Sequence, residues 1–323
     1  HDVQLIDVNS FHEYTPGVID IINDRFSEED LRINLNHLFE GTDIDFSREK
    51  VEKIFPDDNL VKTNAGSHEY SYLVVALGSQ PRTFGVDISE AYTPYSLEDV
   101  KKIKREMDDA EKAVIVGSGY VGIEMAGEMA DELDITVVDG ATRPMPSSSQ
   151  KASHVVLDYL NEADISFIGG KRVVEVRDDR VVTEDGTRIE SDLTLWSGGV
   201  QAADVVLSSL DCGPEGIEVD ETLRSKQYPE IFALGDCADL ALATAHNAMR
   251  QASVAADNIG KNRSEMRKYH ESEYPLLVSL GRTGMMVYGS RAFRTRLFRY
   301  SKDLVFRGYK ASLRAHKAKS RLF

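Results

Sequence analysis

The sequence predicts an α/β fold in which one domain built on a parallel sheet is inserted into another. The first reason is an apolar strand, Ala113–Val116, that runs straight into a glycine-rich turn and a helix. The second is a recurring pattern of apolar runs that end in small or acidic residues, at Gly78, Gly199 and Gly235-Asp236. Ribbons of short strands with polar turns lie between these runs. Together they predict two parallel-sheet units of the Rossmann type.

The glycine-rich turn is Gly117-Ser118-Gly119-Tyr120-Val121-Gly122. Gly117 permits the tight turn, Gly119 lets the backbone approach phosphate groups, and Gly122 lets the helix pack close to the sheet. The free N–H groups at the start of the helix favour an anion. The pattern predicts a dinucleotide site; a strand–turn–helix unit without a ligand is the alternative.

A second strand, Ile135–Val138, ends in Asp139, at the distance from the glycine turn where a ribose-binding acid is expected. An acid there can accept hydrogen bonds from both ribose hydroxyls and would repel the 2′-phosphate of NADP. The sequence therefore favours NAD, although Arg143, four residues later, could weaken that preference.

The N-terminal run Val3–Asp7 predicts another strand that ends in an acid, where a second dinucleotide unit would hold a ribose. No glycine turn precedes it, so we expect the chain to lack the roughly 30 residues that open a Rossmann unit. The order of these signals predicts one domain from 1–95 and 203–275, an inserted domain from 96–202, and a C-terminal region from 276–323.

Composition limits the functional classes. With 41% hydrophobic and 28% charged residues over 323 positions, the chain can bury the cores of two or three domains. No apolar run approaches the roughly 20 residues that span a bilayer, and no secretory signal is visible, which predicts a cytoplasmic protein. The formal charge of −16 disfavours nucleic-acid binding. Cys212 and Cys237 form no C-x-x-C pair, so neither a redox dithiol nor a metal site is expected.

The C-terminal segment has the opposite charge, because eleven Lys or Arg stand against one acid between Arg291 and Phe323. Across 293–315, apolar residues recur at spacings of four or seven, which predicts a basic amphipathic helix with a bend at Gly308. Such a helix lies in a membrane interface and meets anionic lipids. The alternatives are docking of its apolar face on the protein itself or on the mate of a homodimer, and binding of this basic segment to nucleic acid.

These signatures, in this order around one glycine turn, resemble the two-dinucleotide-binding-domain flavoproteins of the pyridine nucleotide-disulfide oxidoreductase fold. Within that family the chain is most similar to type II NADH dehydrogenases. Phe11–Pro16 is similar to their aromatic-x-x-Thr-Pro segment, and Gly122–Glu128 to their Gly-x-Glu-x-x-Gly-Glu run. Ala245–Gln251 is similar to the Ala-Gln-x-x-x-Gln-Gln element of their quinone pocket, except that His246 and Arg250 replace two glutamines.

The resemblance implies an enzyme that binds FAD and NADH, with the inserted domain holding NADH and the other domain holding FAD. It assigns proton handling near the flavin to Glu124, and acceptor-side roles to His246 and Gln251. Plainer roles for these residues, such as a favourable charge at a helix start for Glu124, remain open. Besides the glycine turn and Asp139, the cofactor contacts it implies are Asp7, Thr15, Pro16, Ala76, Gly78, Gly199, Gly235, Asp236 and Ala245.

For Asp236 and for the helix that begins at Ala245, elementary chemistry gives a separate reason to expect contact with FAD. Asp236 ends an apolar strand, where a carboxylate can accept a hydrogen bond from a ribitol hydroxyl of FAD. Thr244 predicts the N-cap of a helix from Ala245 to Ile259 that ends at Gly260. The positive end of that helix would face the flavin. One departure from the family pattern is Leu77, where a hydroxyl residue is usual.

The implied reaction is FAD-dependent oxidation of NADH with electron transfer to a membrane quinone, at the cytoplasmic membrane face. A soluble NADH-dependent reductase of a ferredoxin-like or other small electron carrier is the alternative enzyme. A non-catalytic fragment that binds NAD without FAD is the alternative outside catalysis.

Overall fold

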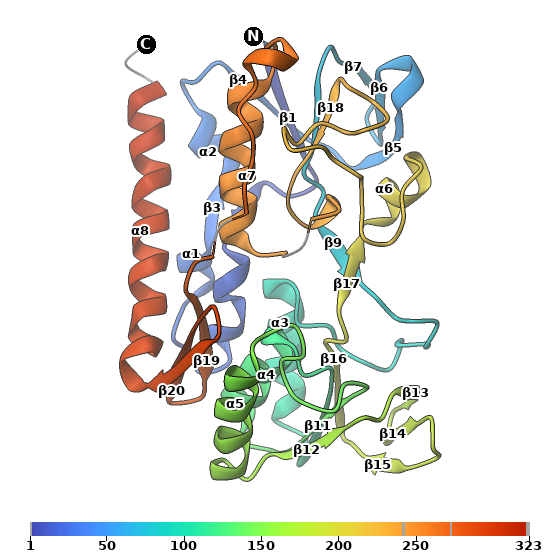
Figure 1. Cartoon of the computed structure of the whole chain (residues 1–323), viewed down its shortest axis with the longest axis vertical. Helices are drawn as coiled ribbons and strands as arrows, with labels where there is room; N and C mark the ends of the chain where they lie inside the picture. Colours follow the sequence, from blue (N-terminus) through green and yellow to red (C-terminus); the bar gives the residue numbers. More distant parts are fainter. Residues whose placement is uncertain (1, 241–242, 272, 321–323) are drawn as a thin grey trace. The chain divides into compact units, whose positions relative to one another are not determined.

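The structure is a computed structural model that describes residues 2–240, 243–271 and 273–320. Residues 1 and 321–323 of the predicted regions lie outside the described residues. The chain forms two compact units, and Figure 1 shows its course through both. Unit 1 comprises His1–His12, Asn34–Gln80 and Val200–Ser272, and unit 2 comprises Glu13–Ile33, Pro81–Gly199 and Glu273–Phe323. Each unit contains helices and parallel strands, which confirms the α/β class.

Unit 2 is built on a four-stranded parallel sheet in the order β12-β11-β10-β16. Its central strand is buried from Ala113 to Val116, as expected for a parallel strand covered on both faces. Val114 lies opposite Thr136 on one side and Thr194 on the other. The strands are β10 (Lys112–Val116), β11 (Asp134–Asp139), β12 (Ser166–Gly169) and β16 (Leu193–Trp196), and the helices are α3 (Leu97–Met107), α4 (Tyr120–Met129) and α5 (Gln150–Glu162).

An antiparallel ribbon follows β12 and confirms the ribbon predicted from Arg172 to Ile189. Its first two strands turn at Asp178-Asp179, and Gly186 has a φ of 82° in the second turn. The strands are β13 (Val173–Arg177), β14 (Arg180–Thr183) and β15 (Arg188–Glu190).

Unit 2 ends in an antiparallel three-stranded sheet and a long helix (Figure 1). The elements are β19 (Leu276–Leu280), β20 (Thr283–Tyr288), β21 (Arg291–Thr295) and α8 (Arg296–Ser320). The predicted basic helix is confirmed from Arg296 onward, and α8 runs through Gly308 without a break. Its predicted start was wrong, because Phe293 lies on β21 opposite Met286 of β20. Pairing with a neighbouring strand there outweighs the helical spacing of the apolar residues.

One apolar core joins the parallel sheet, the C-terminal sheet and α8 within unit 2. Ile123 of α4, Val278 of β19 and Phe306 of α8 are all buried in it. α4 and the C-terminal sheet approach closely at Gly127, where a Cβ would lie 2.6 Å from the backbone nitrogen of Gly281. The remaining elements of unit 2 are η1 (Thr15–Ile21) and α1 (Glu28–Leu31).

Unit 1 contains two pairs of parallel strands, β1 with β4 and β8 with β18, and an antiparallel ribbon of β5, β6 and β7. The ribbon confirms the predicted strands at 51–55 and 60–63, and Asn59 in the turn between them has a φ of 51°. The strands are β1 (Val3–Asp7), β4 (Ile44–Arg48), β5 (Val51–Phe55), β6 (Leu60–Thr63), β7 (Ser67–Glu69), β8 (Leu73–Val75) and β18 (Ile231–Ala233). The helices are α2 (Leu35–Phe39), η2 (Pro56–Asp58), α6 (Asp204–Ser209), η3 (Gly235–Cys237), α7 (Ala245–Asn258) and η4 (Arg263–Glu265).

Four short strands lie where the chain passes from one unit to the other: β2 (Phe11–Glu13), β3 (Arg32–Asn34), β9 (Ser79–Pro81) and β17 (Val200–Ala202). Among the helices of the described residues, none combines the length and the hydropathy needed to cross a bilayer.

Candidate functional site

The glycine turn of unit 2 follows β10 and opens α4. Gly117 has a φ of 103°, and a Cβ there would collide with the backbone of Ser197. Gly122 lies against the carbonyl of Gly117 without room for a side chain, whereas a Cβ on Gly119 would meet no atom within 4 Å. Gly119 is the N-cap of α4, and no side chain caps this helix. The open loop and the uncapped helix start fit the pyrophosphate of a dinucleotide.

Asp139 lies at the end of β11, beside the glycine turn. One carboxylate oxygen accepts hydrogen bonds from the backbone N–H and the hydroxyl of Ser118, both at 2.6 Å. The other accepts one from the N–H of Ala141 at 2.7 Å. A carboxylate has about four acceptor sites, so Asp139 can hold the turn and still accept from a ribose hydroxyl.

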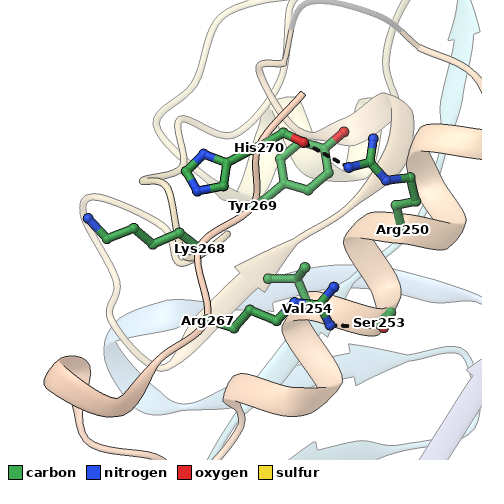
Figure 2. A pocket seen from close by; sticks show the side chains of 7 residues that line it. All are labelled: Arg250, Ser253, Val254, Arg267, Lys268, Tyr269 and His270. Atoms are coloured by element: carbon green, nitrogen blue, oxygen red, sulfur yellow. Dashed lines mark hydrogen bonds between the residues drawn. The ribbon is translucent and has the colours of Figure 1, made fainter. Parts of the chain in front are cut away.

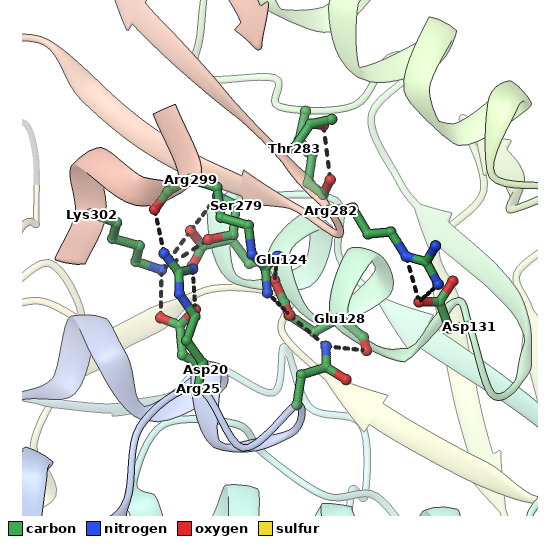
Figure 3. Close-up of polar contacts among 12 residues, drawn as sticks. Asp20, Arg25, Glu124, Glu128, Asp131, Ser279, Arg282, Thr283, Arg299 and Lys302 are labelled. Atoms are coloured by element: carbon green, nitrogen blue, oxygen red, sulfur yellow. Dashed lines mark hydrogen bonds and ion pairs between the residues drawn. The ribbon is translucent and has the colours of Figure 1, made fainter. Parts of the chain in front are cut away.

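Glu124 lies on α4, behind the glycine turn, and is 9% exposed. Its Oε1 accepts hydrogen bonds from the N–H of Ser279 at 2.8 Å and from the Nζ of Lys302 at 3.0 Å. Lys302, on α8, is also 3.4 Å from a carboxylate oxygen of Asp20. Figure 3 shows these groups converging from three segments of unit 2. A buried ionic cluster therefore joins the nucleotide helix to the C-terminal helix.

The cluster continues one helical turn along α4. Glu128 accepts two hydrogen bonds from Arg299, at 2.7 and 3.0 Å, and one from the side-chain amide of Asn23 at 2.6 Å. Arg25 pairs with Asp20 at 3.0 Å and with Asp303 at 2.8 Å. Among these side chains, the carboxyl groups are Asp20, Glu124, Glu128 and Asp303, and the cations are Arg25, Arg299 and Lys302.

Four carboxyl groups thus face three cations, and these charges act together with burial on the pKa values of Lys302 and Glu124. Burial alone would lower the pKa of Lys302, but the carboxylates of Glu124 and Asp20 outweigh it and raise that pKa, so the ammonium stays charged. Burial raises the pKa of Glu124, although Lys302 and the Ser279 N–H act in the opposite direction. Glu124 therefore takes up a proton more readily than an exposed glutamate.

Sequence reasoning found Glu124 but missed Lys302 and Asp20. A signal existed for Lys302, because it lies four residues from both Phe298 and Phe306, on the apolar face of the predicted helix. A lysine on such a face is rarely buried without a partner. No comparable signal marked Asp20. One of its partners, Lys302, is far away in the sequence, and the other, Arg25, follows the turn after η1.

In unit 1 the Gly-Asp turn follows β18. Gly235 has a φ of 65°, and its N–H donates to the side-chain oxygen of Gln251 at 2.7 Å. The Oδ2 of Asp236 accepts a hydrogen bond from the hydroxyl of Ser79 at 2.9 Å. Gln251, predicted to be catalytic, is 2% exposed and braces this turn. Its role in catalysis stays a prediction.

The other predicted FAD contacts are divided between the units. In unit 1, Asp7 ends β1 and accepts a hydrogen bond from the N–H of Asn9 at 2.7 Å. Ala76 and Gly78 form the loop after β8, where Gly78 has a φ of 68°. In unit 2, Thr15 and Pro16 begin η1, and Gly199 follows β16. These assignments stay predictions.

The helix predicted from Ala245 to Ile259 is confirmed as α7, with Thr244 as its N-cap, although it ends at Asn258 and Ile259 is its C-cap. The hydroxyl of Thr244 accepts a hydrogen bond from the N–H of Asn247 at 3.3 Å. Ala245 and His246 are exposed at the start of this helix. Partial burial and the nearby Arg250 cation lower the pKa of His246.

Beside Arg250 lies a hollow with a volume of about 270 Å³. Figure 2 shows the Arg250 side chain reaching toward the 267–270 segment, and its guanidinium donates to the carbonyl of His270 at 2.9 Å. Ser253, Val254, Arg267, Lys268 and Tyr269 complete the lining. Arg250 thus places a cation beside this hollow.

Comparison with known proteins supports the family resemblance. The profile of the family described as pyridine nucleotide-disulphide oxidoreductase matches residues 7–252. The type II NADH:quinone oxidoreductase of Staphylococcus saprophyticus is 26% identical over 316 residues, which cover 84% of this chain and 78% of that protein.

Solved structures share the fold. NDH2 from Plasmodium falciparum, in complex with NADH, has a TM-score of 0.86 at 15% identity, over 100% of this chain and 93% of that chain. A ferredoxin reductase for the CYP199A2 system of Rhodopseudomonas palustris has a TM-score of 0.78 at 22% identity, over 88% of this chain and 75% of that chain. These likenesses confirm the predicted fold of two dinucleotide-binding domains.

Proposed function

Because this chain belongs to the pyridine nucleotide-disulphide oxidoreductase family, we propose that it oxidises NADH with FAD and passes the electrons to a membrane quinone. The chain is an NAD(P)H oxidoreductase whose cofactors are FAD and NADH. The observation that carries the proposal is the position of the glycine turn and Glu124 on one helix, α4. A dinucleotide cradle and a buried proton acceptor are thereby held by the same rigid element.

The residues of unit 2 bind and orient NADH. The loop at Gly117 and Gly119 and the N–H groups of α4 hold the pyrophosphate, and Asp139 accepts from the ribose. When bound, FAD supplies the ring that accepts hydride from the nicotinamide and releases electrons to the acceptor. Asp236 would accept a hydrogen bond from a hydroxyl of FAD, and the positive end of α7 at Ala245 would favour negative charge on the flavin.

Proton handling falls to Glu124, with His246 as the second group. The surplus carboxyl group of the ionic cluster supports this role for Glu124, because one added proton brings the cluster to charge balance. His246 lies exposed at the start of α7, where its lowered pKa favours the neutral imidazole at neutral pH. A neutral imidazole can both give and receive a proton.

The purified protein, assayed with NADH, NADPH and a soluble quinone, tests the reaction. We expect a flavin absorbance spectrum and NADH-dependent reduction of the quinone. A protein without a flavin spectrum and without NADH turnover would refute the proposal. Turnover with a ferredoxin-like carrier and none with quinone would favour the alternative enzyme. The ferredoxin reductase of R. palustris has the same fold as this chain.

We also propose that residues 291–323 bring the enzyme to the cytoplasmic face of a membrane. Leu297, Tyr300 and Leu304 follow one another at helical spacing on α8 and are 65–70% exposed. Their apolar side chains, with exposed Arg296 and Arg307 on the same helix, suit the boundary between anionic headgroups and acyl chains. This face of α8 differs from the face that carries Phe306, which packs on the rest of unit 2.

Flotation with vesicles that contain anionic lipid tests the membrane proposal. Leu297→Ser combined with Leu304→Ser should lower the partition coefficient at least about tenfold, because each leucine inserted contributes about 1.5 kcal/mol or more. Val174→Ser, which removes an exposed apolar side chain from β13, is the matched control and should bind as the unaltered protein does. Equal flotation of all three proteins would exclude α8 as the membrane contact.

A further inference from the structure

A cation from another segment lies beside Asp139, the acid expected to hold the NADH ribose. The next residue, Gly140, has no side chain, and a Cβ there would lie 2.7 Å from the Cγ of Arg172 and 3.5 Å from its Cδ. The stem of Arg172 therefore occupies the space that a side chain at position 140 would fill. In Rossmann units an Arg near the ribose acid can accommodate the 2′-phosphate of NADP.

Backbone hydrogen bonds hold the two residues before Arg172 against the segment that follows β11. The N–H of Lys171 donates to the carbonyl of Asp139 at 3.0 Å, and the N–H of Gly170 donates to the carbonyl of Ala141 at 2.9 Å. The segment after β12 is thus tied to the segment after β11. These bonds keep the backbone at Arg172 beside Asp139, while the Arg172 side chain itself is 76% exposed.

Glu184 neutralises Arg172. One oxygen of Glu184 accepts hydrogen bonds from the Nε of Arg172 at 3.0 Å and from its Nη2 at 2.8 Å. The N–H of Glu184 also donates to the carbonyl of Arg172 at 2.8 Å, so the two residues are paired through backbone and side chain. The hydrogen bond from Arg172 lowers the pKa of Glu184, which keeps that carboxylate charged at neutral pH.

Arg143, the other nearby cation, is directed elsewhere. Its guanidinium donates to the carbonyls of Pro146 at 2.8 Å and Ser148 at 3.0 Å, and to the hydroxyl of Ser153. These bonds hold it in its own loop. The sequence-based expectation that Arg143 weakens the preference for NAD therefore finds no support in its contacts.

We propose that Glu184 is a specificity-determining residue for the coenzyme: by neutralising Arg172 it withholds a phosphate-binding cation from the 2′ position and favours NADH over NADPH. The proposal rests on the proposed function, because it assumes that the glycine turn of unit 2 binds NADH. Asp139 repels a 2′-phosphate directly, whereas Glu184 acts through Arg172. Selectivity then depends on two acids from different segments.

Calorimetric titration of the purified protein with NADH and, separately, NADPH tests this without reference to turnover. Glu184→Gln keeps the shape of the side chain and removes its charge, so we expect the Kd for NADPH to fall about three- to fivefold, the size typical of an exposed ion pair. The Kd for NADH should change less than about twofold. Adding Arg172→Gln to the Glu184→Gln protein should cancel the gain, and so should 1 M salt, which screens exposed charges.

The matched control is Glu175→Gln, which breaks a similarly exposed pair with Arg177 on β13. It should leave the NADPH-to-NADH ratio unchanged. An unchanged ratio in Glu184→Gln, or an equal rise in Glu175→Gln, would overturn the inference while leaving the NADH site intact. Failure of the unaltered protein to bind either dinucleotide would overturn the inference together with the proposed function.

Discussion

Lys302 is a buried lysine on an amphipathic helix, and its partners explain how the fold tolerates it. The ammonium lies between Glu124 and Asp20, and its Nζ is also 3.4 Å from the hydroxyl of Ser279. Taking a charge out of water costs several kcal/mol, which partners recover only with good geometry. The cluster has one more carboxyl group than cations. We therefore expect the loss of the Lys302 charge to destabilise the protein more than the loss of the Glu124 charge.

Lys302→Met should lower the free energy of unfolding by about 3 kcal/mol, because it leaves Glu124 and Asp20 buried without their shared cation. Glu124→Gln should cost less than about 1 kcal/mol, because the remaining acids and cations then balance. Urea unfolding followed by tryptophan fluorescence measures both values. Equal losses in the two variants would contradict the charge count.

A control for these variants lies on the same helix. Arg307→Met removes an exposed cation from α8 and should change the free energy of unfolding by less than about 0.5 kcal/mol. If it matched Lys302→Met, the loss would reflect a general effect of removing positive charge from the helix and not the buried pair.

At the scale of the element, α8 has two apolar faces with different partners. Phe306 is buried against Tyr14 and Phe26, with ring centroids 4.8 Å apart in each pair. Leu304, two positions earlier, is 70% exposed. The sequence showed apolar spacing along the helix, but spacing alone does not tell which face meets the protein and which meets solvent or lipid.

Phe306→Ala should destabilise the protein by about 3 kcal/mol, because it empties a buried aromatic site. Leu304→Ala should change the free energy of unfolding by less than about 0.5 kcal/mol. Both are measured by urea unfolding. A large loss in Leu304→Ala would mean that the exposed face also packs on protein, for example on a second copy of the chain.

Several elements could be predicted because their signals are local. Gly117 and Gly119 follow a buried strand directly, Thr244 caps α7, and Asp178-Asp179 turns a ribbon, so a short window of sequence contains each cause. The start of α8 could not be placed, because pairing of β21 with β20 depends on residues outside such a window. The same holds for the site: Glu124 lay within a motif, whereas its partner Lys302 is 178 positions away.

For the whole molecule, the large net negative charge affects the stability of the folded state. The formal charge is −16, and the segment from Arg291 to Phe323 has eleven cations against one acid, so the rest of the chain is still more acidic. Repulsion among excess like charges opposes the compact state. Exposed ion pairs, which are numerous here, offset only part of it, because each contributes less than about 1 kcal/mol.

Raising the KCl concentration from 0.05 to 1 M at pH 7.5 should therefore raise the thermal unfolding midpoint by several degrees, because the screening length falls to about 3 Å. Scanning calorimetry measures this. The isoelectric point is about 5.0, so the same experiment near that pH should give a smaller gain. A midpoint that falls with salt at pH 7.5 would mean that attractive pairs outweigh the net repulsion.

The close approach of Gly127 to Gly281 limits how this protein could be recombined with others. The nucleotide helix α4 is covered on one side by the C-terminal sheet, and Ile123, Val278 and Phe306 belong to one core. A gene segment for residues 96–202 alone would encode a helix with that face open to water. We therefore expect a chimera between two related proteins to fold only when the nucleotide-binding stretch and the C-terminal segment come from the same parent. In evolution the two stretches should then be inherited together.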